Sequence, residues 1–260
     1  MDIIVCMKQN VDMKQVRIKK ETREPVLEGL PFLFGDMDKN ALEEAVRIKE
    51  KLGGKVIVLS MGPAKLKDTI KDALAGGSDE AVILIDPLFA NLDSRMKAVV
   101  IAKAVQKIAK YDLIILGEGS TDNYSGQLGP RLAEILNLPA ITYTKQVECS
   151  AGTVKAIRNM EESMEVVESK LPALITATSG INEPRIPSLM QILKAGKKPL
   201  QEWNAAALGV TAADLGVMET GVISNLAPAE QRKKVMFEGK PEENINSLVN
   251  ALQKEGVLNT

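Results

Sequence analysis

Glycine and hydroxyl residues crowd one short stretch of the chain, between Gly117 and Pro130. Backbone N–H groups and hydroxyls at a strand-to-helix turn are the donors that hold a pyrophosphate. Asp122, whose carboxylate repels phosphate, is expected instead to accept a hydrogen bond from a ribose hydroxyl or to cap the following helix. A glycine-rich connection without a ligand explains the stretch equally well, because it contains neither a G-x-G-x-x-G nor a Walker A pattern. The hydroxyl residues are Ser120, Thr121, Tyr124 and Ser125.

The rest of the composition excludes several kinds of chemistry. The chain has 260 residues and no histidine, which excludes a Ser-His-Asp or Cys-His nucleophile and a histidine-ligated zinc site. Its two cysteines, Cys6 and Cys149, are too far apart for a Cys-x-x-Cys redox pair and too few for a secreted disulfide framework. We therefore expect a reducing, cytoplasmic location, with Cys6 as a small buried side chain inside a strand.

Charge and hydropathy exclude two classes of partner. A net charge of -1 and an aromatic content of 3% provide neither a basic field for a phosphate backbone nor a base-stacking surface, so no nucleic acid is expected. No apolar run approaches the roughly 20 residues that a spanning helix needs. The apolar run Ile3–Val5, which follows Met1 and Asp2, is too short and its surroundings too acidic for the apolar region of a signal peptide. Insertion into a membrane is therefore not expected either.

Short apolar runs alternate with segments of helical period. Runs that are apolar at every position favour strands of a parallel sheet covered on both faces. The alternation predicts an α/β fold, a doubly wound, mostly parallel, Rossmann-like nucleotide-binding sheet. The predicted strands are Ile3–Met7, Val56–Met61, Ala81–Ile85, Leu113–Gly117 and Ala173–Ala177. The predicted helices are Asp38–Leu52, Lys65–Ala75, Ser94–Ala109 and Gly126–Leu136.

Ligands of open parallel sheets bind beyond the carboxyl ends of the strands. Three strand ends are expected to converge there, namely Cys6–Lys8, Ser60–Pro63 and Gly117–Pro130.

The pattern changes after Pro139. Alternating segments within 147–167 predict an antiparallel excursion around a Ser-Ala-Gly break. From Lys194 onward the chain is rich in alanine, glycine and charge, with short periodic pieces such as Asn246–Gln253. We therefore expect an α/β nucleotide-binding domain at residues 1–193. An extended C-terminal arm at residues 194–260 is expected to pack on the body or around another chain.

A set of motifs follows in order along nearly the whole chain. They are Ile4–Gln9, Asn40–Glu50, Ser60–Pro63, Asp122–Pro130, Leu171–Ala173 and Asn182–Leu189. Together they resemble the β subunit of electron transfer flavoproteins. The last motif, continued through Ala195–Pro199, is similar to the partner-recognition segment of that family.

The resemblance implies a partner subunit, a nucleotide and a docking segment. In that family the β subunit pairs with an α subunit, on which the C-terminal arm would pack, and its pocket holds either AMP or FAD. The implied cofactor-binding residues are Cys6, Gly35, Asp36, Met37, Asp38, Met61, Gly117, Gly119, Ser120, Thr121, Asp122, Asn123, Tyr124, Ser125, Gly126, Gln127 and Leu128. The implied docking residues are Arg185, Ile186, Pro187, Ser188 and Leu189, with Leu189 as the apolar anchor for an acyl-CoA dehydrogenase.

Departures from the common pattern indicate one branch of the family. Housekeeping members carry an Asn-Pro pair where this chain has Gly35-Asp36, and a Lys-Gln-Ala-type start where it has Glu118-Gly119-Ser120. The latter pattern, with Lys197-Lys198-Pro199 and Trp203, resembles the nitrogen-fixation and carnitine-metabolism branch. The β subunit of the caffeyl-CoA reductase complex of anaerobes is similar. That branch includes electron-bifurcating complexes, which oxidise NADH at the β-subunit flavin and send one electron to ferredoxin or flavodoxin and the other through the α-subunit flavin.

Three functions remain open. The first is an FAD-binding subunit that passes electrons from NADH towards an acyl-CoA dehydrogenase or enoyl-CoA reductase. The flavin would then carry the redox chemistry, so no side chain is assigned as general acid or base. Ser120 and Ser125 are the expected pyrophosphate donors, and Cys6 and Met61 the expected pocket walls. The second function is an AMP-holding subunit that docks partners. A universal-stress-type nucleotide-binding domain is disfavoured by the Asn182–Arg185 segment and the tail.

Overall fold

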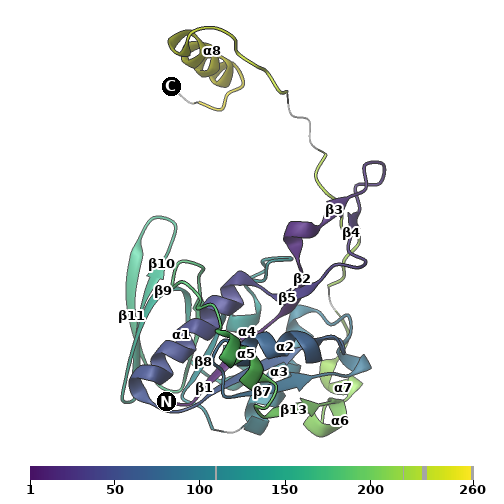
Figure 1. Cartoon of the computed structure of the whole chain (residues 1–260), viewed down its shortest axis with the longest axis vertical. Coiled ribbons are helices and arrows are strands. Elements are labelled where there is room, and N and C mark those ends of the chain that lie inside the picture. Colours follow the sequence, from purple (N-terminus) through teal and green to yellow (C-terminus); the bar gives the residue numbers. More distant parts are fainter. Residues whose placement is uncertain (109, 219, 230–232, 259–260) are drawn as a thin grey trace. The chain divides into compact units, whose positions relative to one another are not determined.

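The computed structural model describes residues 1–108, 110–218, 220–229 and 233–258, in two compact units. The larger unit comprises residues 1–17 and 26–224, and the smaller one residues 18–25 and 225–260. Within the described residues, a sheet of nine strands organises the larger unit in the order β11-β10-β9-β12-β8-β1-β6-β7-β13 (Figure 1). Its strands are β1 (Ile3–Met7), β6 (Val56–Met61), β7 (Glu80–Leu84), β8 (Leu113–Gly117), β9 (Ala140–Ser150), β10 (Thr153–Asn159), β11 (Met164–Lys170), β12 (Ala173–Ala177) and β13 (Leu200–Trp203).

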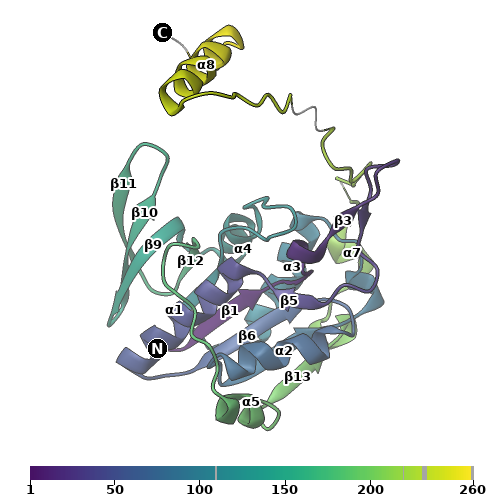
Figure 2. The ribbon, with the colours of Figure 1, turned by 45° about the horizontal axis from the view of Figure 1, so that its top comes forward.

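Helices cover both faces of this sheet (Figure 2). The chain alternates strand and helix, so each crossover carries its helix back over the sheet. The described helices of the larger unit are α1 (Asp36–Leu52), α2 (Leu66–Ala75), α3 (Ser94–Ile108), α4 (Leu128–Leu136), α5 (Leu189–Ala195), α6 (Ala205–Leu208) and α7 (Ala212–Leu215), with 3-10 turns η1 (Met13–Gln15) and η2 (Pro87–Phe89). The smaller unit contains α8 (Pro241–Lys254). Short strand pairs are β2 (Gln9–Val11) with β5 (Phe32–Phe34), and β3 (Arg17–Ile18) with β4 (Pro25–Val26).

The core has two layers because successive side chains of a strand point to opposite faces. From β1, Ile3, Val5 and Met7 pack against α1 and α2, and Ala195 of α5 joins that layer. Ile4 and Cys6 point the other way, into the layer formed with α3, α4, α6 and α7. All five residues of β1 are buried, which is why its sequence is apolar throughout.

The strand order creates a crevice beside β1. From β1 the chain moves to β6 and then β7 on one side, and afterwards crosses back to β8 on the other side of β1. The two connections therefore leave the carboxyl ends of β1 and β8 in opposite directions. Such a topological switch point is where open α/β sheets bind their ligands.

An antiparallel ribbon extends the sheet at one edge. Strand β9 is parallel to β12, and β10 pairs antiparallel with both β9 and β11. Opposite Ile175 and Ala177 of β12, strand β9 contains one extra residue, because Ile141 and Thr144 are their partners. This bulge lies beside the carboxyl end of β8.

Most predicted elements are confirmed. All five predicted strands are present, and the α/β fold with its antiparallel excursion is as expected. Helix α1 begins at Asp36 rather than Asp38, and α4 begins at Leu128 rather than Gly126. The predicted end of the third helix, residue 109, lies outside the described residues.

Pattern reasoning missed β2, β5 and β13, which are too short to show a period. Strand β13 nevertheless joins the sheet by pairing with β7, within the segment 194–224 of the larger unit. Among the described helices, none combines the length and apolar character needed to cross a bilayer.

Candidate functional site

A cavity of about 840 Å³ lies at the switch point. It is bounded by the carboxyl ends of β1, β6 and β8 and by the starts of α3 and α4, and Met218 and Thr220–Val222 also line it. Eleven of the residues implied by the family resemblance line it. They are Cys6, Asp38, Met61, Gly117, Gly119, Ser120, Asn123, Ser125, Gly126, Gln127 and Leu128.

One wall of the cavity is apolar. The sheet register places Cys6 beside Leu59 on β6 and beside Leu116 on β8, and all three side chains line the cavity. Ile101 of α3 and Met61 extend the same wall. Burial, with the nearby Asp38 carboxyl, raises the pKa of the Cys6 thiol to about 12. Cys6 is therefore a neutral wall residue and not a nucleophile.

The glycine-rich loop after β8 is tightly folded. A Cβ at Gly119 would lie 2.8 Å from the Tyr124 ring, and one at Gly117 would lie 2.9 Å from Met37 Cβ. Polar groups of the loop form hydrogen bonds with one another; for example, Ser120 Oγ donates to Asn123 Oδ1 at 3.1 Å. These glycines are needed because side chains would fill the space in which the loop closes on itself.

Asp38 joins three segments at the cavity. Its Oδ2 accepts a hydrogen bond from the Lys8 backbone N–H at 3.1 Å, and the backbone N–H groups of Gly117 and Gly35 also bind the carboxyl group. Burial raises the pKa of Asp38 to about 7, although these donors and the Lys8 charge oppose the shift. The residue therefore holds together the ends of β1 and β8 and the first turn of α1.

Lys8 and Asp122 form an ion pair at the cavity edge. Lys8 Nζ lies 2.5 Å and 2.6 Å from the two carboxylate oxygens of Asp122, and 3.4 Å from Ser120 Oγ. Burial alone would raise the pKa of Asp122, but the hydrogen bonds from Lys8 and Ser120 hold it below its ordinary value. The cavity is lined by Lys8 and not by Asp122.

A cationic group of residues lines the cavity near the starts of α3 and α4. Lys8, Arg95, Lys97 and Arg131 all line it. Lys97 is half-buried in the first turn of α3, where the helix dipole disfavours a cation. Burial and the charge of Lys8 both lower the pKa of Lys97. Among the described residues no carboxylate forms an ion pair with Lys97, so a bound anion would relieve its unfavourable setting.

The starts of these two helices are linked directly. Ser94 Oγ lies 2.6 Å from Gln127 Oε1, which joins α3 to the residue before α4. Asp93 Oδ1 accepts from the Met96 N–H at 2.9 Å and so caps α3. Residues at both helix starts thus line the same cavity.

Six of the implied cofactor-binding residues do not line the cavity. Three are at the start of α1 and three are in the loop after β8. Thr121 accepts from Asn10 Nδ2 at 3.2 Å, and Tyr124 is exposed with its backbone at a φ of 45°. The six are Gly35, Asp36, Met37, Thr121, Asp122 and Tyr124.

Sequence reasoning assigned no role to several residues that do line the cavity. The cations Lys8, Lys97 and Arg131 and the apolar Leu59 and Ile101 are among them. One signal was available, because the first turn of the helix at Ser94–Ile108 contains two cations and no acidic residue. That composition is the reverse of the usual preference at a helix start.

The implied docking segment is held against α1 at its beginning. Arg185 donates to Glu43 at 2.7 Å and to Glu50 at 2.6 Å, and Asn182 exchanges side-chain-to-backbone hydrogen bonds with Asn40. Burial opposes ionisation of Glu43, but its hydrogen bonds to Arg185 and Arg47 hold the pKa below its ordinary value. Arg185 is thus engaged inside the chain.

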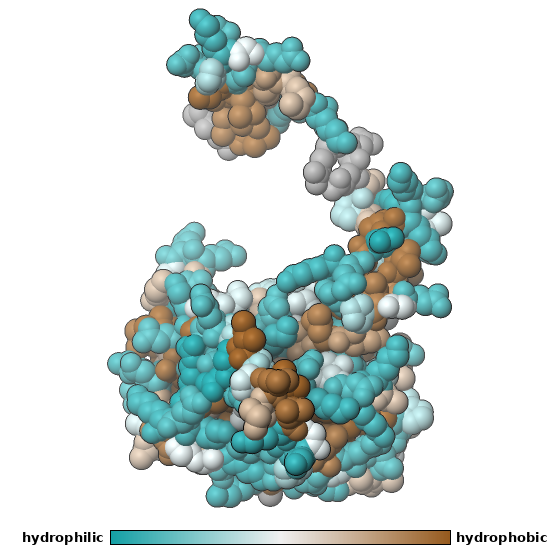
Figure 3. All heavy atoms as spheres, viewed as in Figure 1, coloured by the Kyte–Doolittle hydropathy of each residue, from teal (hydrophilic) through white to brown (hydrophobic). Residues whose placement is uncertain are grey.

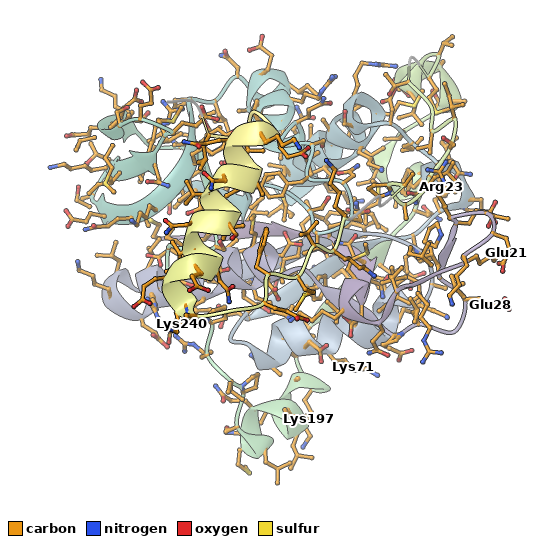
Figure 4. All side chains as sticks on the ribbon, turned by 90° about the horizontal axis from the view of Figure 1, so that it is seen from above. Glu21, Arg23, Glu28, Lys71, Lys197 and Lys240 are labelled. Atoms are coloured by element: carbon orange, nitrogen blue, oxygen red, sulfur yellow. The ribbon has the colours of Figure 1, made fainter. Side chains whose placement is uncertain are left out.

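The residues that follow present an apolar surface. Ser188 caps α5 in a capping box with Gln191. The exposed side chains, here called the α5 patch, are Ile186, Leu189, Met190, Ile192 and Leu193. Brown spheres gather over α5 in Figure 3, and Figure 4 shows the segment that carries Lys197 projecting beyond the helix that carries Lys71. Contiguous exposed apolar groups of this kind mark interaction surfaces.

Comparison with known proteins assigns the family. Residues 28–208 match the model of the electron transfer flavoprotein domain. The chain is 38% identical over 261 residues to the electron transfer flavoprotein subunit beta of Thermoanaerobacterium thermosaccharolyticum, covering 99% of this chain and 100% of that protein. It is 32% identical over 262 residues to the caffeyl-CoA reductase-Etf complex subunit CarD of Acetobacterium woodii, with 99% and 100% coverage. The β subunit of Bacillus subtilis is 32% identical, with 98% coverage of both chains. The chain therefore belongs to the electron transfer flavoprotein family, as a β subunit.

Proposed function

We propose that this β subunit pairs with an α subunit and holds FAD in the cavity at the switch point. The observation that carries the proposal is the cavity itself, which combines a group of cations with an apolar wall in about 840 Å³. A dinucleotide that joins a charged pyrophosphate to a flat, largely apolar ring system matches both parts. AMP is the second candidate, because the same cations and loop suit its single phosphate.

The volume favours FAD over AMP. Small-molecule pockets span roughly 300–1,000 Å³ and enclose most of their ligand's surface. A cavity of about 840 Å³ is near the upper end of that range. AMP alone would leave much of this space, including the wall formed by Leu59, Met61 and Ile101, to water. Exposing that wall to water would be unfavourable.

The chain's own residues would bind and orient the cofactor. Ser120 and Ser125 line the cavity and are the proposed pyrophosphate donors, while Lys8 and Lys97 supply positive charge. The Ser120 hydroxyl would exchange its hydrogen bond to Asn123 Oδ1 for one to the ligand. Cys6 and Met61 would pack against a ring. When bound, the flavin would supply the electron-transfer chemistry, and the protein its binding, orientation and electrostatics.

The electron route is proposed from the branch resemblance. NADH is the proposed transient electron donor, by flavin-based bifurcation. An acyl-CoA dehydrogenase or enoyl-CoA reductase is the proposed high-potential acceptor, and ferredoxin or flavodoxin the low-potential one. The name of the relative from Acetobacterium woodii, 32% identical, supports an enoyl-CoA reductase as partner class.

The α5 patch is the proposed docking surface for the acyl-CoA enzyme. Leu189 is 72% exposed and Ile186 is 94% exposed, so both can insert into a partner without repacking this chain. Arg185 would contribute by fastening the segment to α1 through Glu43 and Glu50. Residues 182–185 thereby provide a fixed base for the patch.

The decisive experiment is the nucleotide content of the heterodimer, obtained by co-expression with the α subunit, denaturation and chromatography. Two FAD per heterodimer without AMP supports the proposal. One FAD with one AMP replaces it by the AMP-holding, docking function. If the purified heterodimer has lost its ligands, the nucleotide-free protein is titrated with FAD and with AMP, and the two affinities are compared.

A further inference from the structure

Glu118 is a buried carboxylate at the cavity wall. It directly follows β8, is 4% exposed and lines the cavity. One oxygen, Oε2, accepts hydrogen bonds from the Thr176 hydroxyl and from the Tyr143 backbone N–H, the latter at 2.7 Å. These two donors fix the carboxyl group to the neighbouring strands β12 and β9.

The sheet is irregular at the point where Tyr143 reaches Glu118. The bulge in β9 inserts one extra residue opposite β12, and Tyr143 has a φ of 57°. A positive φ is unfavourable for a residue with a Cβ. Bulges recur next to functional sites because they re-aim individual groups. Here the bulge directs the Tyr143 N–H away from the strand ladder and onto Glu118 and Thr176 Oγ1.

The second oxygen of Glu118 has no such donor. Within the described ranges, no residue donates a hydrogen bond to Oε1 and no cation forms an ion pair with Glu118. A Cβ built on Gly126, which lines the cavity, would lie 3.6 Å from Oε1. Oε1 is therefore open to the cavity without a donor from the chain. A ligand that fills the cavity excludes water from this oxygen, so the ligand itself is expected to supply the hydrogen-bond donor.

We propose that Glu118 Oε1 accepts a hydrogen bond from a donor group of the bound nucleotide, and so determines which end of the ligand lies beside it. The inference rests on the proposed nucleotide-binding function. A carboxylate oxygen accepts from hydroxyl, amino and ring N–H groups and repels phosphate. Donors of this kind exist on both halves of FAD, as the ribose hydroxyls and amino group of adenosine and as the ribityl hydroxyls and ring N–H of the flavin.

Glu118 and the cations then orient the ligand together. Lys8 and Lys97 attract the phosphate groups, and Glu118 excludes them from its own position. A nucleotide bound in reverse would bring phosphate to the carboxylate and leave Lys97 without an anion. Such paired attraction and repulsion is how a site selects one binding mode.

The substitution Glu118→Gln tests the polarity of this contact. The Tyr143 N–H can only donate, so the amide oxygen must take the place of Oε2 and the amide NH2 group must face the cavity. A ligand donor is then repelled, whereas a ligand acceptor would be attracted. We expect the stripped heterodimer to bind FAD at least about tenfold more weakly, since a hydrogen bond to a charged group is lost. Glu134→Gln, an exposed carboxylate on α4, is the matched control.

The two halves of the ligand are separated by titrating AMP alongside FAD. Weaker binding of both assigns the donor to adenosine, and weaker binding of FAD alone assigns it to the flavin half. Unchanged or tighter binding of both ligands by Glu118→Gln overturns the inference and leaves the proposed function intact. A wild-type heterodimer that binds neither FAD nor AMP overturns both.

Ligand analogues test the same contact in the unaltered protein, in case the variant does not fold. The analogues are 2′-deoxy-AMP, 3′-deoxy-AMP and inosine monophosphate for the adenosine half. For the flavin half they are FAD methylated at the flavin N3 and FAD analogues that each lack one ribityl hydroxyl. Weaker binding of at least one of these analogues supports the inference. Binding of every analogue as tightly as its parent overturns it.

Discussion

The ammonium group of Lys8 lies 2.5 Å from a carboxylate oxygen of Asp122 and joins the end of β1 to the loop after β8. These two segments flank the switch point, and they are 114 residues apart in the chain. The pair therefore closes the loop at the cavity edge. Its electrostatic role is to hold Lys8 beside the cavity while Asp122 offsets part of its charge.

Asp122→Ala is expected to weaken nucleotide retention because the loop loses this attachment. The two side chains are 37% and 36% exposed, so the free energy of unfolding should change by less than about 1 kcal/mol. The measurement is the FAD and AMP content of the heterodimer after gel filtration. Asp68→Ala, which removes an exposed ion pair with Lys71 on α2, is the control. Equal nucleotide content in both variants would refute the role of the pair.

Lys97→Met is expected to lower the affinity for FAD about tenfold, because a charged hydrogen-bond donor to phosphate is lost. The ligand-free protein should be as stable as the wild type or more stable, since burial and Lys8 both disfavour the Lys97 charge. Titration of the stripped heterodimer and thermal unfolding measure the two effects. Lys103→Met, an exposed lysine on the same helix, should change neither. Loss of stability together with affinity would show that Lys97 is structural.

Asp38 should make stability depend on pH. Its folded pKa of about 7 lies above the ordinary value of 3.8 because of burial, so the folded state binds more protons between these values. The contribution of Asp38 to the free energy of unfolding therefore falls as the pH rises from about 4 to about 7, and does not change with pH above that. The Asp38→Asn variant should lack this pH dependence, so its stability relative to the wild type should be greater at pH 8 than at pH 5.

Urea unfolding at a series of pH values measures this dependence. Asp68→Asn, on the exposed surface of α2, is the control and should keep the wild-type slope. An Asp38→Asn variant with the wild-type slope would contradict the assignment.

Gly129→Ala should destabilise the contact between α4 and β12. The added Cβ would lie 2.5 Å from the Thr176 Cγ2 methyl in a buried position. Overpacking of this kind costs about 1–3 kcal/mol. Thr176→Ser removes that methyl and keeps the hydroxyl that binds Glu118, so the double variant should recover most of the loss. Gly180→Ala, where an added Cβ meets nothing within 4 Å, is the control. Chemical denaturation measures all four, and absence of rescue would rule out the methyl clash.

Leu189→Ala should weaken docking of an acyl-CoA dehydrogenase while leaving bound nucleotide unchanged. Truncation of a central apolar anchor typically costs about tenfold in affinity or more. Because Leu189 is 72% exposed, the stability of the chain should be nearly unaffected. The KM for the heterodimer in the dehydrogenase reaction should rise. Met164→Ala, exposed on the β11 edge, is the control. Normal electron delivery at limiting partner concentration would count against the α5 patch.

The sequence by itself determined the elements and much of the site. Strands such as Ile3–Met7 and Leu113–Gly117 are apolar at every position because both faces of the sheet are covered, and that pattern is local. The glycine-rich stretch after β8 was recognisable because its composition is also a local property of the sequence. Eleven residues expected from the resemblance line the cavity, because the carboxyl ends of parallel strands meet at one edge of the sheet.

Only the tertiary structure decided which side chains face the cavity. Lys97 and Glu118 gained their significance from neighbours far away in sequence, Lys8 for the first and Tyr143 and Thr176 for the second. The bulge that aims Tyr143 at Glu118 depends on the register between β9 and β12, which no local period encodes. Burial and charge at a site are sums over the elements packed around it, and those sums exist only once the chain has folded.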